Sequence, residues 1–137
     1  MEKIYDLKII GYFNDVAKMP DGTGVYFVFA RTNKANDDGS HDLRILYIGK
    51  AEEGINKRLS NHEKYEDFEG ELRNGESLRF AYTLVDTKDC ARVESAFIYH
   101  CQPPINDSGT DSFNYDKTTI KYSLPSKKYS FFVERLV

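Results

Sequence analysis

The sequence predicts a small α+β domain, and three observations support this prediction. Two short apolar runs, 25–29 and 45–48, are rich in β-branched and aromatic residues and are bounded by glycine and polar clusters, as strands are. A third run, 78–84, alternates apolar and polar residues with the period of a strand. In the segments 54–62 and 90–101 the apolar residues recur with helical spacing instead.

The first two runs are close enough in the chain to form a hairpin. Gly24-Val25-Tyr26 opens the first run and Tyr47-Ile48-Gly49 closes the second, so the two tyrosines are expected to lie close together across the strand pair. The intervening segment 32–42 is polar and too long for a tight turn, which predicts a mobile loop. The residues before the hairpin, 4–16, carry scattered apolar anchors and are expected to form a packed extension.

A helix is predicted to begin after Gly54 and to carry two basic side chains on one edge. Ile55 and Leu59 form its apolar stripe, and Arg58 and His62 lie beside that stripe, where both can face a cleft. An amphipathic helix with a basic margin has the same pattern without any function. Residues 65–76 are acidic and end at Asn74-Gly75, which predicts a second short helix with a glycine stop.

The helix that follows Asp86-Thr87 carries a carboxylate inside its apolar stripe. The stripe includes Cys90, Val93, Phe97, Ile98 and Cys101, and Glu94 projects among them. A buried ionised carboxylate is costly unless it is paired or binds a metal. Glu94 is therefore expected either to form a buried salt bridge, for example with Arg58, or to be functional, and we favour the functional role.

The end of the chain combines a turn with strand-like segments. Pro103-Pro104 stops the last helix, and Asn106 lies in the turn that follows. Segments 120–124 and 129–133 flank Pro125 and would add an edge strand, for which their lysines are suited.

Length and charge limit the possible classes of protein. The 137 residues suffice for one domain, 1–137, with a core that needs neither disulfides nor a structural metal. Cys90 and Cys101 are roughly 16 Å apart along one helix, which is too far for a disulfide, so both are predicted to be buried thiols. No apolar run is long enough for a membrane span and the N-terminus lacks a signal-peptide core, so we expect a soluble cytoplasmic protein without membrane contact.

The net charge of −3 is unevenly distributed along the chain. Segments 44–64 and 117–137 are basic, with net charges of +2 and +4, whereas 1–43 and 65–116 are acidic, with −2 and −7. Basic segments are compatible with nucleic-acid contact and also with a solvated face, so charge alone leaves both possibilities open.

Taken together, the motif residues resemble those of a GIY-YIG endonuclease domain over about residues 20–107. They occur in the family's order and on the expected elements: Gly24-Val25-Tyr26, Tyr47-Ile48-Gly49, Arg58, His62, Glu94 and Pro104-Ile105-Asn106. The resemblance implies a three-stranded antiparallel sheet flanked by helices, here with an N-terminal extension and a basic C-terminal extension, 108–137.

The resemblance also implies a metal-dependent DNA endonuclease that hydrolyses phosphodiester bonds with one divalent metal, Mg²⁺ or Mn²⁺. By correspondence Glu94 holds the metal, Arg58 steadies the scissile phosphate and Asn106 supports the site. Tyr26, Tyr47 and His62 would position or activate the water, and the sequence does not decide which of them is the base. Lys50 and Lys57 would add positive charge for the substrate, and Lys50 is placed where a family lysine could lower a tyrosine pKa.

The chain also departs from the family pattern. The spacing from Tyr47 to Arg58 is one residue longer than in some relatives, with Gly54 as the expected insertion, and many relatives carry a separate DNA-binding domain. Specificity is therefore expected from the extensions or from a protein partner. The alternative function is a catalytically inactive module of the same fold that binds nucleic acid or protein.

Overall fold

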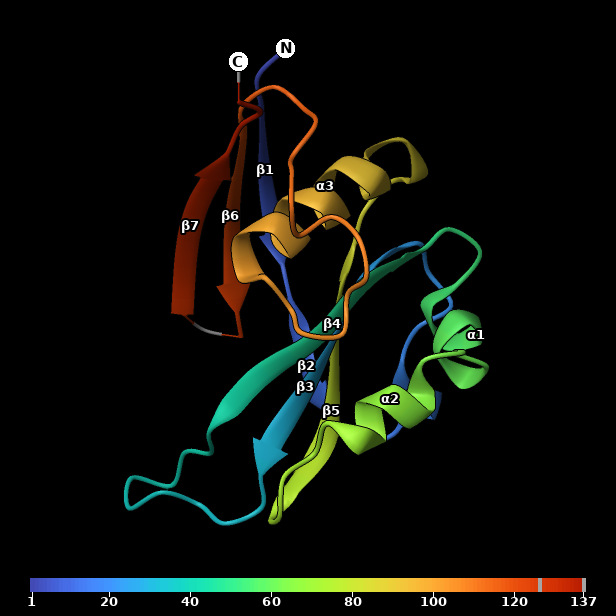
Figure 1. Cartoon of the computed structure of the whole chain (residues 1–137), viewed down its shortest axis with the longest axis vertical. Coiled ribbons are helices and arrows are strands. Elements are labelled where there is room, and N and C mark those ends of the chain that lie inside the picture. The colour runs from blue at the N-terminus through green and yellow to red at the C-terminus, as the bar shows by residue number, and fades with distance from the viewer. Residues whose placement is uncertain (126, 137) are drawn as a thin grey trace.

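The protein is α+β, with one long helix between two sheets, as predicted for its class (Figure 1). The computed structural model describes residues 1–125 and 127–136. The main sheet is antiparallel, in the order β2-β5-β3-β4, and comprises β2 (Ile10–Phe13), β5 (Glu76–Leu84), β3 (Gly24–Thr32) and β4 (Leu43–Ala51). The second sheet has the order β1-β6-β7 and comprises β1 (Lys3–Lys8), β6 (Thr118–Leu124) and β7 (Lys127–Val133).

The predicted hairpin and third strand are confirmed as β3, β4 and β5, but the prediction of a three-stranded main sheet was wrong. The segment 4–16, expected to be a packed extension, contains two strands, and its β2 pairs with β5 as a fourth strand. The strand-like segments near the C-terminus do not extend the main sheet. They form the second sheet with β1, which runs parallel to β6.

Strand β5 has both faces covered, although an alternation of apolar and polar residues is typical of a strand with one buried face. Phe80 packs into the cluster beneath the short helices, whereas Ala81 packs on the opposite face toward α3 (Thr87–Cys101). The small side chain of Ala81 is therefore a core residue rather than a solvent-facing one. This second face is covered because α3 contacts β3 and β4 on one side and β6 and β7 on the other.

The two short helices are shorter than predicted. α1 (Ile55–Ser60) ends at Asn61, whose backbone N–H donates to the Leu59 carbonyl, so His62 lies in the following turn and not on the helix. α2 (Tyr65–Gly70) ends before Asn74-Gly75, and Gly75, at φ +83°, belongs to the turn that enters β5. Within the described residues, no helix has the length and apolar character needed to cross a membrane.

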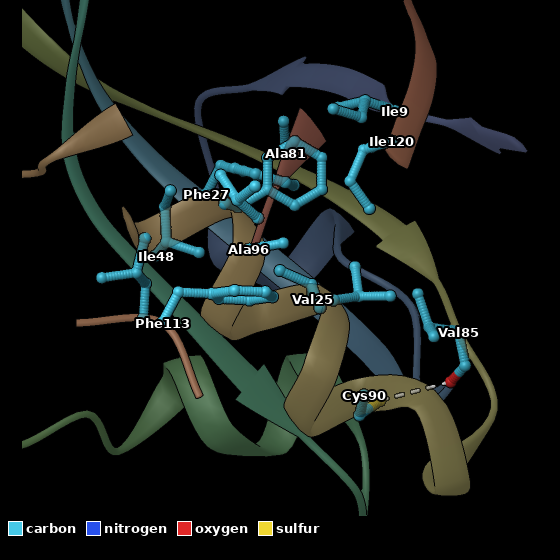
Figure 2. Close-up of a cluster of buried hydrophobic side chains, with 14 residues drawn as sticks. Ile9, Val25, Phe27, Ile48, Ala81, Val85, Cys90, Ala96, Phe113 and Ile120 are labelled. Carbon is cyan, nitrogen blue, oxygen red and sulfur yellow. Dashed lines mark hydrogen bonds between the residues drawn. The ribbon is translucent and has the colours of Figure 1, made fainter. Parts of the chain in front are cut away.

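Helix α3 confirms the predicted apolar stripe and forms the centre of the core. Figure 2 shows Phe27, Ile48 and Ala81 of the main sheet and Ile120 of the second sheet around Ala96 of this helix. Cys90 is buried and its thiol donates to the Val85 carbonyl at 3.3 Å, whereas Cys101 is partly exposed. Both cysteines are free thiols, but the prediction that they are buried is confirmed only for Cys90.

Candidate active site at the edge of strand β4

The two motif tyrosines lie close together across the β3-β4 pair, as predicted. Tyr26 is opposite Gly49, Tyr47 is opposite Val28, and the two ring centroids are 6.3 Å apart. Tyr26 is only 1% exposed, whereas Tyr47 is half-buried. The ring of Tyr26 lies against Gly49, where an added Cβ would be 2.3 Å from the tyrosine Oη. Glycine at position 49 is therefore what allows Tyr26 to occupy this place.

His62 is buried and joins the tyrosine pair through a hydrogen bond. Its Nε2 lies 2.7 Å from Tyr26 Oη, and its Nδ1 accepts from the backbone N–H of Lys64 at 3.1 Å. Burial, and secondly the charge of Arg58, lower the pKa of His62 to about 4, so the ring is neutral at pH 7. A neutral ring that accepts at Nδ1 carries its hydrogen on Nε2, and this N–H donates a hydrogen bond to Tyr26 Oη. His62 consequently has no free lone pair with which to take a proton.

Arg58 forms a bidentate ion pair with Glu63, a residue that the sequence analysis did not single out. The two guanidinium nitrogens donate to Glu63 at 2.8 and 2.9 Å, which holds the pKa of that carboxyl at about 2. The salt bridge between Arg58 and Glu94, considered from the sequence, is absent among the described residues. Glu63 directly follows His62 in the turn after α1, so the acidic partner of Arg58 is only five residues away from it in the sequence.

Glu94 projects from α3 toward the edge of β4 and is half-buried. Burial raises the pKa of this carboxyl, and the charge and backbone hydrogen bonding of Lys50 partly offset the effect. Burial raises the pKa of Tyr47 and of Tyr26, and the charge of Glu94 adds a smaller rise to each. Within residues 1–125 and 127–136, no cation lies within ion-pair distance of Glu94.

Asn106 closes the free edge of β4. Its amide accepts from the Ile48 backbone N–H at 3.0 Å and donates to the Ile48 carbonyl at 2.8 Å, and the neighbouring Ile105 N–H donates to the Leu46 carbonyl. These bonds replace those of a neighbouring strand and attach the segment after α3 to β4. Asn106 therefore positions the edge that carries Tyr47.

A cleft of about 470 Å³ lies beside these residues. Lys50, Lys57 and Arg58 line it, together with Ala51, Glu52, Glu53, Gly54 and Asn61. Lys50 pairs with Glu52 at 3.0 Å and Lys57 with Glu53 at 3.9 Å. The cleft thus gathers the three predicted phosphate-contacting cations, each with a carboxylate partner, while Tyr26, Tyr47, His62 and Glu94 are not among its lining residues.

The donor set at this edge fits magnesium better than a metal held only by protein ligands. In the described part of the chain, no group of three or more His, Cys, Asp and Glu side chains could hold a metal ion. Magnesium retains several waters and commonly takes one or two carboxylates from the protein. Glu94, half-buried and without a cation partner in the described residues, fits this role.

Comparisons with protein-family models, curated proteins and solved structures found no match.

Proposed function

We propose that this protein is a metal-dependent endonuclease that hydrolyses phosphodiester bonds in DNA. The observation that supports this proposal is the gathering of five side chains from separate parts of the chain at the edge of β4. Tyr26, His62 and Tyr47 contact one another, and after the larger effect of burial the charge of Glu94 raises and that of Arg58 lowers the pKa of both tyrosines. Side chains that served only their own helices or strands would have no reason to converge.

Arg58 would bind the scissile phosphate. Its planar guanidinium already holds a carboxylate through two parallel hydrogen bonds, and a phosphate presents the same pair of acceptors. Glu63 is largely exposed, so a phosphate can replace it without leaving a buried charge unpaired. Glu63 would then act as a competitor that substrate displaces.

Glu94 would hold the divalent metal. When bound, the ion would supply positive charge to the phosphoryl oxygens and the leaving group. Lys50 lies near the same carboxylate and would limit the negative charge of the site when no metal is bound.

Tyr47 is the best-placed group to position the attacking water. His62 has both ring nitrogens engaged, and Tyr26 is 1% exposed, whereas Tyr47 keeps accessible surface. Burial and then the charge of Glu94 raise the pKa of Tyr47, so any cation that neutralises Glu94 lowers it again. His62 is a positioning residue that holds Tyr26 against Gly49 and Tyr47.

The direct test is cleavage of branched, nicked and linear DNA in the presence of Mg²⁺ or Mn²⁺. Wild-type protein should cut at least one substrate, and Glu94→Gln should lose about 100-fold or more, as is typical when one electrostatic stabiliser is removed. Glu69→Gln, an exposed acid on α2, is the matched control and should retain activity. Failure of the wild type to cut any substrate at high enzyme concentration would reject the proposal.

The alternative is a binding module that has this arrangement without the activity. It is favoured by the fact that each cation in the cleft already has a carboxylate partner and that segment 65–116 is acidic. This alternative predicts DNA binding without cleavage, or a protein partner whose binding does not depend on Arg58.

A further inference from the structure

A second cleft, of about 370 Å³, lies at the opposite edge of the main sheet and has a different charge pattern. Its lining residues are Tyr12, Phe13, Asn14, Lys18, Arg31 and Arg79. Three of these six carry positive charge and none carries negative charge. The candidate active site is at β4, whereas this cleft is beside β2, the other edge strand.

The two arginines of this cleft are close neighbours of like charge. Arg31 of β3 is opposite Ser77 of β5, and Arg79 lies two residues further along β5 on the same face. Such diagonal neighbours are about 7–8 Å apart, within reach of long side chains. Burial, and secondly the charge of Arg31, lower the pKa of Arg79, so the charged form of this arginine is held at a cost.

No carboxylate compensates these charges in the described part of the chain. Neither arginine forms an ion pair there, nor does Lys18, whose ammonium donates to the neutral Asn14 side chain. Arg79 is fixed by neutral acceptors, with Nη1 donating to Ser77 Oγ at 3.0 Å and to the Leu78 carbonyl at 2.8 Å. Its orientation is thus set while its charge remains available to a ligand.

Three other arginines of the described chain are paired with carboxylates: Arg44 with Glu76, Arg58 with Glu63 and Arg135 with Asp116. Arg92 donates to neutral oxygen acceptors instead, as Arg79 does. Three cations without an acid in one cleft therefore fit an anion that comes from outside the chain. Guanidinium groups match the oxygens of a phosphate, and the adjacent Phe13 and Tyr12 offer flat apolar surface for a nucleotide.

We propose that this cleft binds a backbone phosphate of the DNA at a point away from the bond that is cut. This inference rests on the proposed function, because it takes DNA as the substrate. Arg31 lies five residues along β3 from Tyr26, an offset of roughly 17 Å at about 3.4 Å per residue, which is less than one helical turn of duplex DNA. One DNA molecule can consequently reach both sites.

The test is the salt dependence of DNA binding by the double variant Arg31→Gln/Arg79→Gln. Glutamine at position 79 keeps an amide that can donate to the same neutral acceptors. Binding of a short fluorescent duplex would be followed by anisotropy in EDTA, which prevents metal-dependent cleavage. Loss of one phosphate contact should reduce the salt slope by about 0.9, and affinity at moderate salt should fall several-fold.

The matched control is Arg73→Gln/Lys88→Gln, which removes the same charge from two exposed positions outside the cleft. A salt slope of the cleft variant equal to that of the control would overturn the proposal. Arg31→Gln alone should not lower the melting temperature, because it relieves repulsion between like charges. A change in slope that is accompanied by unfolding of this single variant would also count against the cleft.

Titration with inorganic phosphate separates a DNA site from a site for a free phosphate compound. The DNA assignment would be overturned by the following pair of results: inorganic phosphate binds in the cleft, and the double variant binds the duplex as the wild type does. The two proposals can fail separately. An altered salt slope in a protein that cuts no DNA would reject the nuclease and keep the cleft, whereas cleavage with an unchanged slope would reject only the cleft.

Discussion

The close approach of Tyr26 to Gly49 gives a prediction that needs no substrate. In Gly49→Ala the new Cβ would lie 2.3 Å from Tyr26 Oη and 2.4 Å from Cζ, whereas ordinary contacts are 3.4–4 Å. The ring would have to move by roughly 1 Å to restore normal contact. Tyr26 is 1% exposed and lies against Tyr47 and His62, so it has no free space to enter.

We expect Gly49→Ala to lower the free energy of unfolding by about 2–4 kcal/mol, from overpacking of the core and loss of the hydrogen bond to His62. For a domain of this size that corresponds to a fall in melting temperature of roughly 4 °C per kcal/mol. Urea and thermal unfolding measure both quantities. Gly70→Ala is the matched control, because nothing lies within 4 Å of its added Cβ, and it should be neutral or slightly stabilising.

A double-mutant cycle tests whether the collision with Tyr26 is the cause. Tyr26→Leu shortens the side chain, so Gly49→Ala should cost much less in that background, with a coupling energy of about 1–3 kcal/mol. Equal costs of Gly49→Ala in both backgrounds would refute the reasoning, as would a Gly49→Ala protein as stable as Gly70→Ala.

Three other predictions follow from the titrating and charged groups. Burial raises the pKa of Glu94 above its usual 4.5, so the wild type should lose stability as the pH rises through that raised value. Glu94→Gln should therefore be more stable than the wild type at pH 7 but not below pH 4.5. Mg²⁺ should stabilise only the wild type. A Glu94→Gln protein that is less stable at pH 7 would indicate a structural ion pair instead. The pKa of His62 falls from 6.5 to about 4 on folding, so the free energy of unfolding should decrease by up to about 3 kcal/mol as the pH falls from 6.5 to 4. Urea unfolding at a series of pH values should show that His62→Gln removes most of this decrease, and an unchanged pH profile would contradict the assigned burial. Each phosphate contact made by the C-terminal segment should contribute about 0.9 to the salt slope of DNA binding, and this contribution should disappear when four lysines are changed to alanine: Lys117, Lys121, Lys127 and Lys128. A slope that stays the same would mean that these lysines only keep the second sheet soluble.

Several elements could be predicted because their information is local. The alternation in β5, the apolar stripe of α3 and the β-branched runs of β3 and β4 each extend over enough residues to determine the type of element. The hairpin also follows from the neighbouring positions of its two strands. For this reason the predicted closeness of Tyr26 and Tyr47 was confirmed.

The N-terminal strands show where local reasoning failed. Tyr5, Leu7 and Ile9 alternate with Asp6 and Lys8, which is the pattern of a strand and not of the packed extension predicted for 4–16. The partner of β1 is β6, more than a hundred residues later, and β2 has only four residues. Pairing between segments so distant is decided by packing around α3, which no window of sequence contains.

The sequence by itself thus determined the class of the fold, the central hairpin, the long helix and the residue types available for chemistry, because periodicity and motif spacing are properties of short segments. Only the tertiary structure decided that Arg58 pairs with Glu63, that His62 donates to Tyr26 and that Asn106 closes the edge of β4. It also decided that Arg31 and Arg79 share a cleft without a carboxylate. These relations depend on strand register and on where turns place their side chains, and a one-residue change in either would direct the same side chains elsewhere.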